Sequence, residues 1–267
     1  MGTFIFDLDG TLYREDVALP GAREAVGELR RRGHRVLFAT NNSTTTRADY
    51  ARRLDTMGFA IEPDGLATSA YSTALYLRDL PNPPRSLLIL GAPAIAAEIV
   101  AAGLDARTDG APPVDAVVVG LDRAFTYQRL AAAQSAILAG ARLICTNRDL
   151  QFPGRDGITP GAGSIVAAVE AASLATATTI GKPEPHLYRA LMEATGADPA
   201  TTVVVGDNMR TDIAAALPLG LYSVLVLTGV SPAPSPDVRP QPDLVLPSVA
   251  DLIGGLEAAR PDIMAIA

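Results

Sequence analysis

The sequence is poor in several residue types that would suggest particular classes of protein. Of its 22 basic residues one is lysine, Lys182, and the other 21 are arginines; there is one cysteine and no tryptophan. A single cysteine, Cys145, excludes an internal disulfide bond and a zinc site built from several cysteines. No segment resembles a signal peptide, and no run of about 18 uncharged apolar residues could span a membrane. A cytoplasmic protein is therefore expected.

The charge balance also narrows the possible partners. The chain of 267 residues has a formal net charge of −7, with 48% hydrophobic and 19% charged residues. These are values of a globular protein, and the length corresponds to one large or two modest domains. Because nucleic-acid binding usually requires a basic surface, the acidic balance argues against a nucleic-acid partner.

Strand-like and helix-like patterns alternate along the chain, which predicts an α/β fold. A short apolar strand ends at Phe6, helical spacing follows over residues 21–32, and a second apolar strand covers residues 35–39. A strand, helix, strand order implies a right-handed crossover and a parallel sheet. Residues 46–57 and 69–80 have the pattern of two further helices.

A proline cluster predicts a domain boundary. Three of the four residues 81–84 are proline, which neither a helix nor a central strand accommodates. The alternating pattern restarts after them and, from residue 181, resumes the character of the first segment. We therefore predict a core domain formed by residues 1–80 and 181–267, with residues 81–180 inserted as a second α/β domain.

Two aspartates stand at the end of the first strand. Asp7 and Asp9 follow the apolar run and precede Gly10, and the alternation of a strand would direct both carboxylates to one face. Ligands of open α/β sheets bind at this end of the strands. Neighbouring carboxylates repel each other unless a cation or a shared proton intervenes, which favours Mg²⁺. An Asp-x-Asp-Gly turn closing a hairpin is the alternative.

Two more strand ends carry groups suited to phosphate. Thr40 and Asn41 offer a hydroxyl and an amide, although a polar turn that caps the next helix would have the same residues. Lys182 stands at a strand-to-helix turn, where its ammonium would neutralise both a phosphate and Asp7. In a chain that otherwise uses arginine, this one lysine indicates a position that needs a compact ammonium, unless it is merely a residue of compositional bias.

A fourth strand end is acidic. Asp207 follows an apolar strand at residues 202–205 and would complete a Mg²⁺ site together with Asp7 and Asp9. Asp212 falls in the first turn of a helix predicted over residues 211–217, where it would orient a metal-bound water or Lys182. Complementing the helix dipole is the alternative role for these two acids.

These four groups meet the needs of phosphoryl transfer. Hydrolysis of a phosphate monoester is slow enough to require accelerations approaching roughly 10²¹-fold, so that a nucleophile, a metal and a charge clamp are all needed. Asp7 is the candidate nucleophile, which would form an aspartyl-phosphate. Asp9 would protonate the leaving alkoxide and later activate water.

The same residues resemble the motifs of the haloacid dehalogenase (HAD) superfamily. The similarity lies in Asp7-Leu8-Asp9-Gly10-Thr11, in Thr40, in Lys182, and in Gly206-Asp207 with Asp212. The insertion resembles the large α/β cap of the branch (class IIA) that contains 4-nitrophenylphosphatases, phosphoglycolate and pyridoxal phosphatases and a ribonucleotide monophosphatase, through residues 119–123, 146–149 and 160–164. The resemblance implies a Rossmann-like parallel-sheet core, an aspartyl-phosphate, Mg²⁺ dependence and a homodimer formed through the cap.

The inserted domain is expected to determine substrate specificity. Asn147, Arg148 and Asp149 follow an apolar strand and would face the leaving group of the substrate, although a purely structural loop is the alternative. A cap would cover the mouth of the core and contact the part of the substrate that is not phosphate.

The predicted function is that of a Mg²⁺-dependent phosphatase of small phosphorylated metabolites. Phosphoglycolate, glycerol phosphate, sugar phosphates, pyridoxal phosphate and nucleotides all remain candidate substrates. A dehalogenase would need neither a second acid at Asp9 nor the metal ligand Asp207, and both are present. A phosphotransferase remains an alternative because an acceptor alcohol competes with water for the same intermediate. A metabolite-binding module without catalytic activity is the alternative outside the enzymes.

Overall fold

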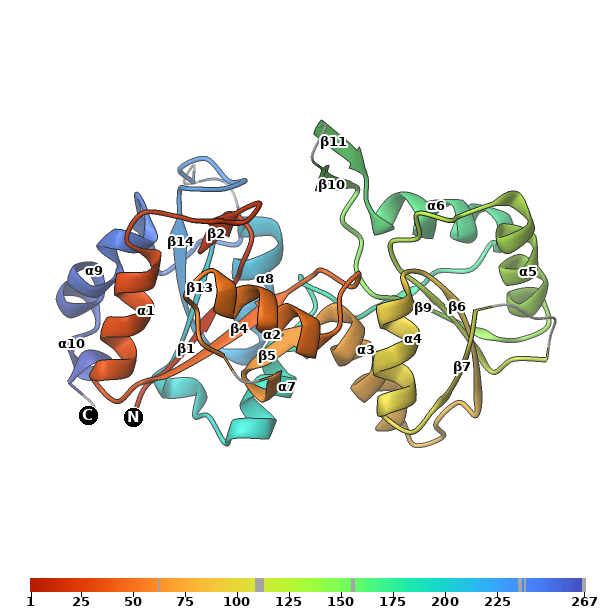
Figure 1. Cartoon of the computed structure of the whole chain (residues 1–267), viewed down its shortest axis with the longest axis horizontal. Helices are drawn as coiled ribbons and strands as arrows, with labels where there is room; N and C mark the ends of the chain where they lie inside the picture. The colour runs from red at the N-terminus through yellow and green to blue at the C-terminus, as the bar shows by residue number, and fades with distance from the viewer. Residues whose placement is uncertain (62, 109–112, 155–156, 235–236, 238, 266–267) are drawn as a thin grey trace. The chain divides into compact units, whose positions relative to one another are not determined.

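The chain folds into two compact units, each with its own β-sheet. The computed structural model describes residues 1–61, 63–108, 113–154, 157–234, 237 and 239–265. The first unit comprises Met1–Thr40, Ala48–Ala67 and Lys182–Ala267, and the second comprises Asn41–Arg47 and Thr68–Gly181. Each sheet has helices packed against it (Figure 1). The predicted α/β class, with a Rossmann-like parallel core and an inserted α/β unit, is confirmed.

Parallel strands of the first unit end side by side. The strand order is β15 (Leu244–Leu246), β14 (Tyr222–Val226), β13 (Thr202–Gly206), β1 (Thr3–Phe6), β4 (Arg35–Thr40) and β5 (Leu66–Thr68). Strand β1 pairs in parallel with both β13 and β4, so that Phe6 lies opposite Val205 on one side and Phe38 on the other. The residues that follow these three strands therefore meet at one edge of the sheet.

Alternation along the strands fills both faces of this sheet. Phe4 and Phe6 belong to a large buried cluster with helical residues of α1, α2 and α9, whereas Leu225 packs on Met209 and Ile213. The helices of the unit are α1 (Ala22–Arg31), α2 (Arg47–Thr56), α7 (His186–Thr195), α8 (Ala214–Ala216), α9 (Leu252–Ala259) and α10 (Pro261–Met264). A π-helical turn covers Met209–Ile213, and 3-10 turns cover Pro63–Gly65, Pro199–Thr201, Leu217–Leu219 and Val249–Asp251.

The sheet of the second unit is parallel throughout. Its strands run in the order β12 (Thr178–Thr179), β9 (Arg142–Cys145), β8 (Ala116–Val119), β6 (Ser86–Leu90) and β7 (Asp105–Arg107). Helices α3 (Ser69–Arg78) and α4 (Pro93–Ala101) pack on each other, as do α5 (Tyr127–Leu138) and α6 (Ala162–Ser173). The residues of the strands alternate between two separate buried clusters. One cluster includes residues of α3 and α4, and the other includes residues of α5 and α6.

The boundary between the units differs from the one that the prolines indicated. Helix α3, which the sequence placed with the core, belongs to the second unit. Its residues Ala74 and Leu77 lie in one buried cluster with Leu87 and Ile89 of β6. Prolines stop a helix, but burial of the apolar face of the helix decides which unit it joins.

Several short strands have no counterpart in the sequence prediction. The structure contains the edge strands β5 and β7 and two hairpins, β2–β3 (Tyr13–Arg14 with Val17–Ala18) and β10–β11 (Gln151–Gly154 with Gly157–Pro160). Segments of two to four residues are too short to display a hydrophobic period.

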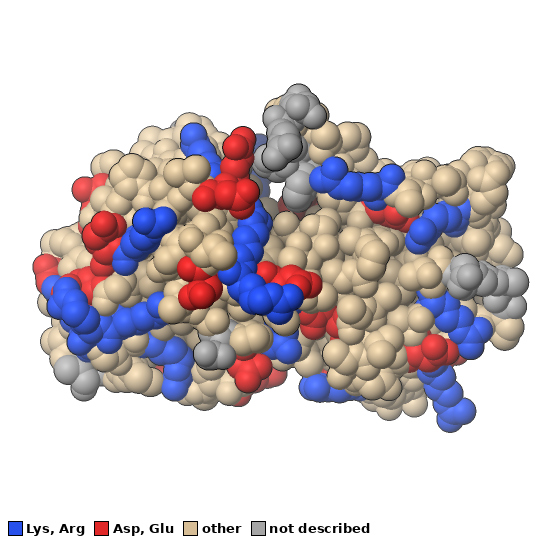
Figure 2. Space-filling model, in the orientation of Figure 1, with Lys and Arg blue, Asp and Glu red and all other residues tan. Residues whose placement is uncertain are grey.

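The surface carries charges of both signs. On the face drawn in Figure 2, acidic and basic side chains are intermixed rather than separated into large fields of one sign. Of the helices that the structure describes, none has the length and apolar character needed to cross a bilayer.

Candidate active site

The strand ends of the first sheet bring three of the predicted site residues to one edge. Asp7 directly follows β1, and its backbone N–H donates to the Val205 carbonyl at 2.8 Å, extending the ladder to β13 by one residue. Asp207 directly follows β13, and Thr40 is the last residue of β4. All three are buried. This edge is the place where open parallel sheets bind ligands.

Lys182 joins two of the carboxylates at this edge. Its Nζ donates to Asp7 Oδ1 at 2.5 Å, to Asp212 Oδ1 at 2.6 Å and to the Ala39 carbonyl at 3.2 Å. Burial alone would lower the pKa of the ammonium, but the carboxylates of Asp212 and Asp7 outweigh burial and raise that pKa well above its ordinary value. Lys182 therefore stays charged, and both contacts are charge-assisted hydrogen bonds.

The two downstream aspartates are held by backbone groups. Asp212 Oδ2 accepts from the Asn208 N–H at 3.0 Å, so that its two oxygens have separate protein donors, Asn208 and Lys182. Asp207 Oδ2 accepts from the Val230 N–H at 2.7 Å. Asp212 thus contacts Lys182, and its role in orienting Lys182 stays a prediction.

The cluster of carboxylates fits a divalent cation. Asp7, Asp207 and Asp212 each place one oxygen within 4.8 Å of the others. Desolvation raises the pKa of Asp7 well above its usual range; Lys182 opposes this, and the charges of Asp212 and Asp207 add to it. Three carboxylates facing one ammonium leave an excess of buried negative charge. Hard cations such as Mg²⁺ prefer such oxygen ligands, and a bound cation would favour the ionised form of Asp7.

Two glycines leave room for the Asp207 carboxylate. A Cβ atom at Gly229 would lie 1.8 Å from Asp207 Oδ2, and one at Gly10 would lie 2.7 Å from the same oxygen. Gly10 also has a φ of 85°, a left-handed conformation that favours glycine. The glycine after the paired aspartates is therefore required both by the turn and by the close approach of Asp207.

Asp9 is not among the three carboxylates of this cluster. Strand β1 ends at Phe6, so the alternation that predicted a shared face for Asp7 and Asp9 does not continue to Asp9. Asp9 Oδ2 accepts hydrogen bonds from the hydroxyls of Tyr13 at 3.1 Å and Tyr50 at 3.3 Å. Although Asp9 is exposed, the surrounding protein atoms desolvate its carboxyl group and raise the pKa of Asp9. A metal-binding role for Asp9 stays a prediction.

The two predicted phosphate residues at the end of β4 belong to different units. Thr40 belongs to the first unit, next to Ala39, whose carbonyl accepts from Lys182. Asn41 belongs to the second, where its Nδ2 donates to the Asp149 carboxylate at 3.2 and 3.4 Å. Asn147 Nδ2 in turn donates to the Asn41 carbonyl at 2.8 Å. Asn41 thus lies with two of the residues that we predicted to contact substrate from the cap.

The Arg148 guanidinium donates several hydrogen bonds within the second unit. Its guanidinium donates to the Glu170 carboxylate at 2.6 and 3.1 Å, to the Thr179 hydroxyl at 2.8 Å and to the Ala177 carbonyl at 3.1 Å. The bidentate pair with Glu170 joins the end of β9 to α6. This geometry gives Arg148 a clear structural role.

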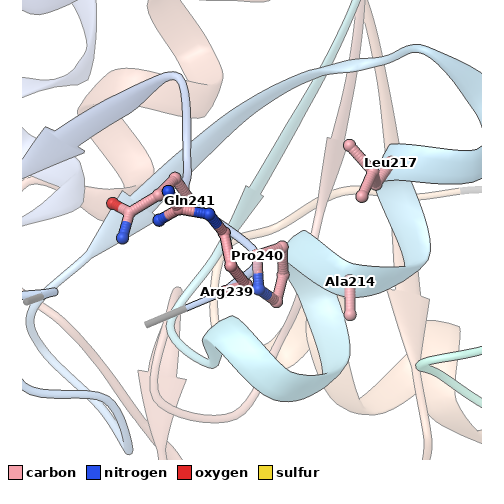
Figure 3. Close-up of a pocket in the computed structure, with 5 residues that line it drawn as sticks. All are labelled: Ala214, Leu217, Arg239, Pro240 and Gln241. Atoms are coloured by element: carbon pink, nitrogen blue, oxygen red, sulfur yellow. The ribbon is translucent and has the colours of Figure 1, made fainter. Parts of the chain in front are cut away.

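A separate pocket lies in the first unit. Its volume is about 450 Å³, and its lining consists of Ala214, Leu217, Arg239, Pro240 and Gln241 (Figure 3). None of these residues is a predicted site residue, and the lining contains no carboxylate. We therefore take the charged cluster, and not this pocket, as the candidate active site.

Comparison with known proteins finds similarity over most of the chain. A model described as haloacid dehalogenase-like hydrolase matches residues 4–105, and a second model of HAD-like hydrolases matches residues 179–252. The glycerol-3-phosphate phosphatase of Gallus gallus is 37% identical over 288 residues, with 96% of this chain and 92% of the relative covered. Human chronophin is 39% identical over 273 residues, with 95% and 92% covered.

A solved structure extends the comparison. The crystal structure of a glycerol phosphate phosphatase from Mycobacterium tuberculosis in complex with magnesium has a TM-score of 0.87 and 34% sequence identity to this chain. The match covers 94% of this chain and 76% of that one.

A substitution at Gly229 tests whether Asp207 is a metal ligand. Gly229→Ala places a methyl group where the carboxylate lies, so we expect Mg²⁺ affinity, measured by isothermal titration calorimetry, to fall roughly 10–100-fold, as for other changes beside a metal ligand. Gly254→Ala in α9 is the control, because nothing lies within 4 Å of the added Cβ. Equal affinities of the two variants would contradict a ligand role for Asp207.

The pH dependence of metal binding gives a second test. Desolvation, with the charge of Asp212, raises the pKa of Asp207 to about 6. A raised pKa means that protons compete with the metal for Asp207 below about that pH. We therefore expect the affinity for Mg²⁺ to fall between about pH 8 and about pH 5, and binding near the pKa to release protons. Calorimetry in buffers of different ionisation enthalpy measures that release, and an affinity independent of pH would contradict the expectation.

Proposed function

Since the chain belongs to the haloacid dehalogenase-like hydrolase family and is a phosphoric monoester hydrolase, we propose that it is a Mg²⁺-dependent phosphatase of small metabolites. In this proposal the reaction proceeds through an aspartyl-phosphate on Asp7. The observation that carries the proposal is the buried contact of Asp7 with Lys182 at 2.5 Å, inside a cluster of carboxylates. This arrangement combines a nucleophile, a fixed positive charge and a set of metal ligands at one strand edge.

In the first half-reaction, a carboxylate oxygen of Asp7 attacks phosphorus. The bond between phosphorus and the ester oxygen breaks, and the leaving oxygen takes a proton from Asp9. Lys182 holds Asp7 in place and contributes positive charge near the transferred group. A Mg²⁺ ion bound by Asp7 and Asp207, with Asp9, would neutralise negative charge on the phosphate.

In the second half-reaction, Asp9 accepts a proton from water as the water attacks the phosphorus of the acyl phosphate. Phosphate leaves and the Asp7 carboxylate is restored, so that no group is consumed over the cycle. Thr40 and Asn41 are the proposed additional phosphate contacts. Thr40 is favoured by its place at the end of β4, in the same unit as Asp7.

Substrate selection is proposed to lie in the second unit. Asn147, Arg148 and Asp149 remain the proposed contacts for the part of the substrate that is not phosphate. Among them Arg148 also ties β9 to α6, so its loss would disturb the unit as well as any contact. Because relatives are named glycerol-3-phosphate phosphatases, glycerol phosphate is the first substrate to test. The homodimer and the cytoplasmic location stay predictions.

Release of phosphate from a panel of substrates tests the proposal. We expect the wild-type protein to hydrolyse 4-nitrophenyl phosphate and glycerol phosphate with Mg²⁺ but not with EDTA, and Asp7→Asn to lose turnover by several orders of magnitude because it removes the nucleophile. Asp55→Asn, which changes an exposed aspartate of α2, is the matched control and should keep full activity. Intact-mass analysis after acid quenching should detect a phosphorylated chain in the wild type and in Asp55→Asn but not in Asp7→Asn.

Each part of the proposal can fail separately. Turnover that survives Asp7→Asn would overturn the covalent intermediate, and turnover that survives EDTA would overturn the metal dependence. Phosphoryl transfer that requires an added acceptor alcohol would identify a phosphotransferase. A protein that binds phosphate esters with Mg²⁺ but never turns them over would be a binding module.

A further inference from the structure

Two buried tyrosine hydroxyls contact the Asp9 carboxylate, and the functions assigned above make no use of them. Asp9 Oδ2 lies 3.1 Å from the Tyr13 hydroxyl and 3.3 Å from that of Tyr50, and the two hydroxyl oxygens are 2.6 Å apart. Both tyrosines are fully buried, at 0% exposure, whereas Asp9 is exposed. The exposed Asp9 carboxylate is thus hydrogen-bonded to two side chains of the buried core.

The turn after the first strand brings Tyr13 back to Asp9. The Gly10 N–H donates to the Tyr13 carbonyl at 2.8 Å, and the Tyr13 N–H donates to the Leu8 carbonyl at 3.4 Å. Tyr50 lies in α2 and is 37 positions after Tyr13 in the sequence. Two elements of the same unit therefore converge on one carboxylate oxygen.

The guanidinium of Arg53 packs near the rings of both tyrosines. The Arg53 guanidinium lies 5.2 Å from the Tyr13 ring centre and 5.6 Å from that of Tyr50, and its Nε donates to Asp16 at 2.8 Å. At these distances the guanidinium is attracted to both rings by cation–π interaction. The Tyr50 hydroxyl also has a hydrogen bond with the Thr40 side chain, so the pair is joined to the end of β4.

Counting protons shows what the pair can do. Burial raises the pKa of both phenols, which therefore remain neutral, and each has one proton to donate. When Asp9 is ionised, its Oδ2 accepts from one hydroxyl, and the other hydroxyl donates either to the same oxygen or to its neighbouring phenol at 2.6 Å. When Asp9 carries a proton, a phenol oxygen can accept that proton's hydrogen bond, because a hydroxyl is both donor and acceptor. The same side-chain position of Asp9 thus has partners before and after a proton transfer.

We propose that Tyr13 and Tyr50 are positioning residues that hold the Asp9 carboxyl group in the orientation from which it protonates the leaving oxygen. The inference rests on the proposed function, in which Asp9 is the general acid. When the bond from phosphorus to the ester oxygen breaks, its electron pair goes to that oxygen, which takes the Asp9 proton. Proton transfer requires a donor within hydrogen-bond reach, and an exposed aspartate without partners would populate several rotamers.

The substrate's leaving group provides a readout that a merely structural role would not affect. An alkoxide such as that of glycerol phosphate needs a proton to depart, whereas 4-nitrophenolate is a stable anion that leaves without one. The ratio kcat/KM includes only steps up to departure of the leaving group, so it is independent of how fast the aspartyl-phosphate is hydrolysed. We therefore compare kcat/KM for the two substrates.

The test uses Tyr13→Phe and Tyr50→Phe, which remove one hydroxyl each and keep the buried rings. We expect kcat/KM for glycerol phosphate to fall roughly tenfold in each variant, a part of the roughly 10²–10⁴-fold effect of a positioned general acid. For 4-nitrophenyl phosphate we expect a change below about twofold, since that step needs no acid. Asp9→Asn should lower kcat/KM more for glycerol phosphate than for 4-nitrophenyl phosphate, with a larger loss for glycerol phosphate than either tyrosine variant shows.

Two comparisons complete the design. Tyr222→Phe removes a tyrosine hydroxyl from the start of β14, and it should leave both kcat/KM values unchanged. The double variant of Tyr13 and Tyr50 should lose less than the product of the two single losses, because both hydroxyls act on one carboxylate oxygen. Thermal unfolding of every variant shows whether it is folded under the assay conditions.

The outcomes separate this inference from the proposed function. Equal losses for both substrates, or no loss for either, in folded Tyr13→Phe and Tyr50→Phe would overturn the positioning role while the phosphatase assignment stands. Wild-type protein without turnover, or with turnover that survives Asp7→Asn, would instead overturn the proposed function. A loss confined to glycerol phosphate supports the inference.

Discussion

A buried ammonium between two carboxylates is the interaction on which the site depends. Lys182 has three N–H donors and meets three acceptors: Asp7, Asp212 and the Ala39 carbonyl. Removing one partner of a buried ion pair costs about 3–5 kcal/mol, because it leaves an uncompensated charge. The planar fork of arginine carries five donors and could not be satisfied by the same three acceptors. This explains why a chain with 21 arginines has its single lysine here.

Sheet topology makes that interaction possible between distant parts of the sequence. Asp7 and Lys182 are 175 positions apart, and Thr11 and Asp207, whose side chains meet at 3.5 Å, are 196 apart. Parallel pairing of β1 with β13 in a fixed register aligns the strand ends. The hydrogen bonds between the strands fix the position of each residue that directly follows a strand. The site residues are therefore held by the buried sheet.

The sequence predicted what depends on strands and their ends, and it missed what depends on long-range packing. Asp7, Thr40 and Asp207 could be placed because apolar runs mark the strands and parallel strands share one carboxyl edge. The helix predicted to begin at Thr211 instead begins at Met209, since Asn208 caps it by accepting from the Arg210 N–H at 3.0 Å. Nothing local to Tyr50 indicates that its hydroxyl reaches Asp9, because that contact depends on how α2 packs.

The environments of the paired aspartates differ in a way that suits the two roles proposed for them. Asp7 is bound by an ammonium, which has only donors and therefore stabilises the charged form against burial, the main cause that raises the pKa of Asp7. The Asp9 carboxyl contacts two hydroxyls, which donate to a carboxylate and accept from a carboxylic acid equally well. A nucleophile must remain ionised, whereas a general acid must gain and lose a proton in every cycle. The end of β1 at Phe6 is what separates the two environments, because it releases Asp9 from the face on which Asp7 meets Lys182.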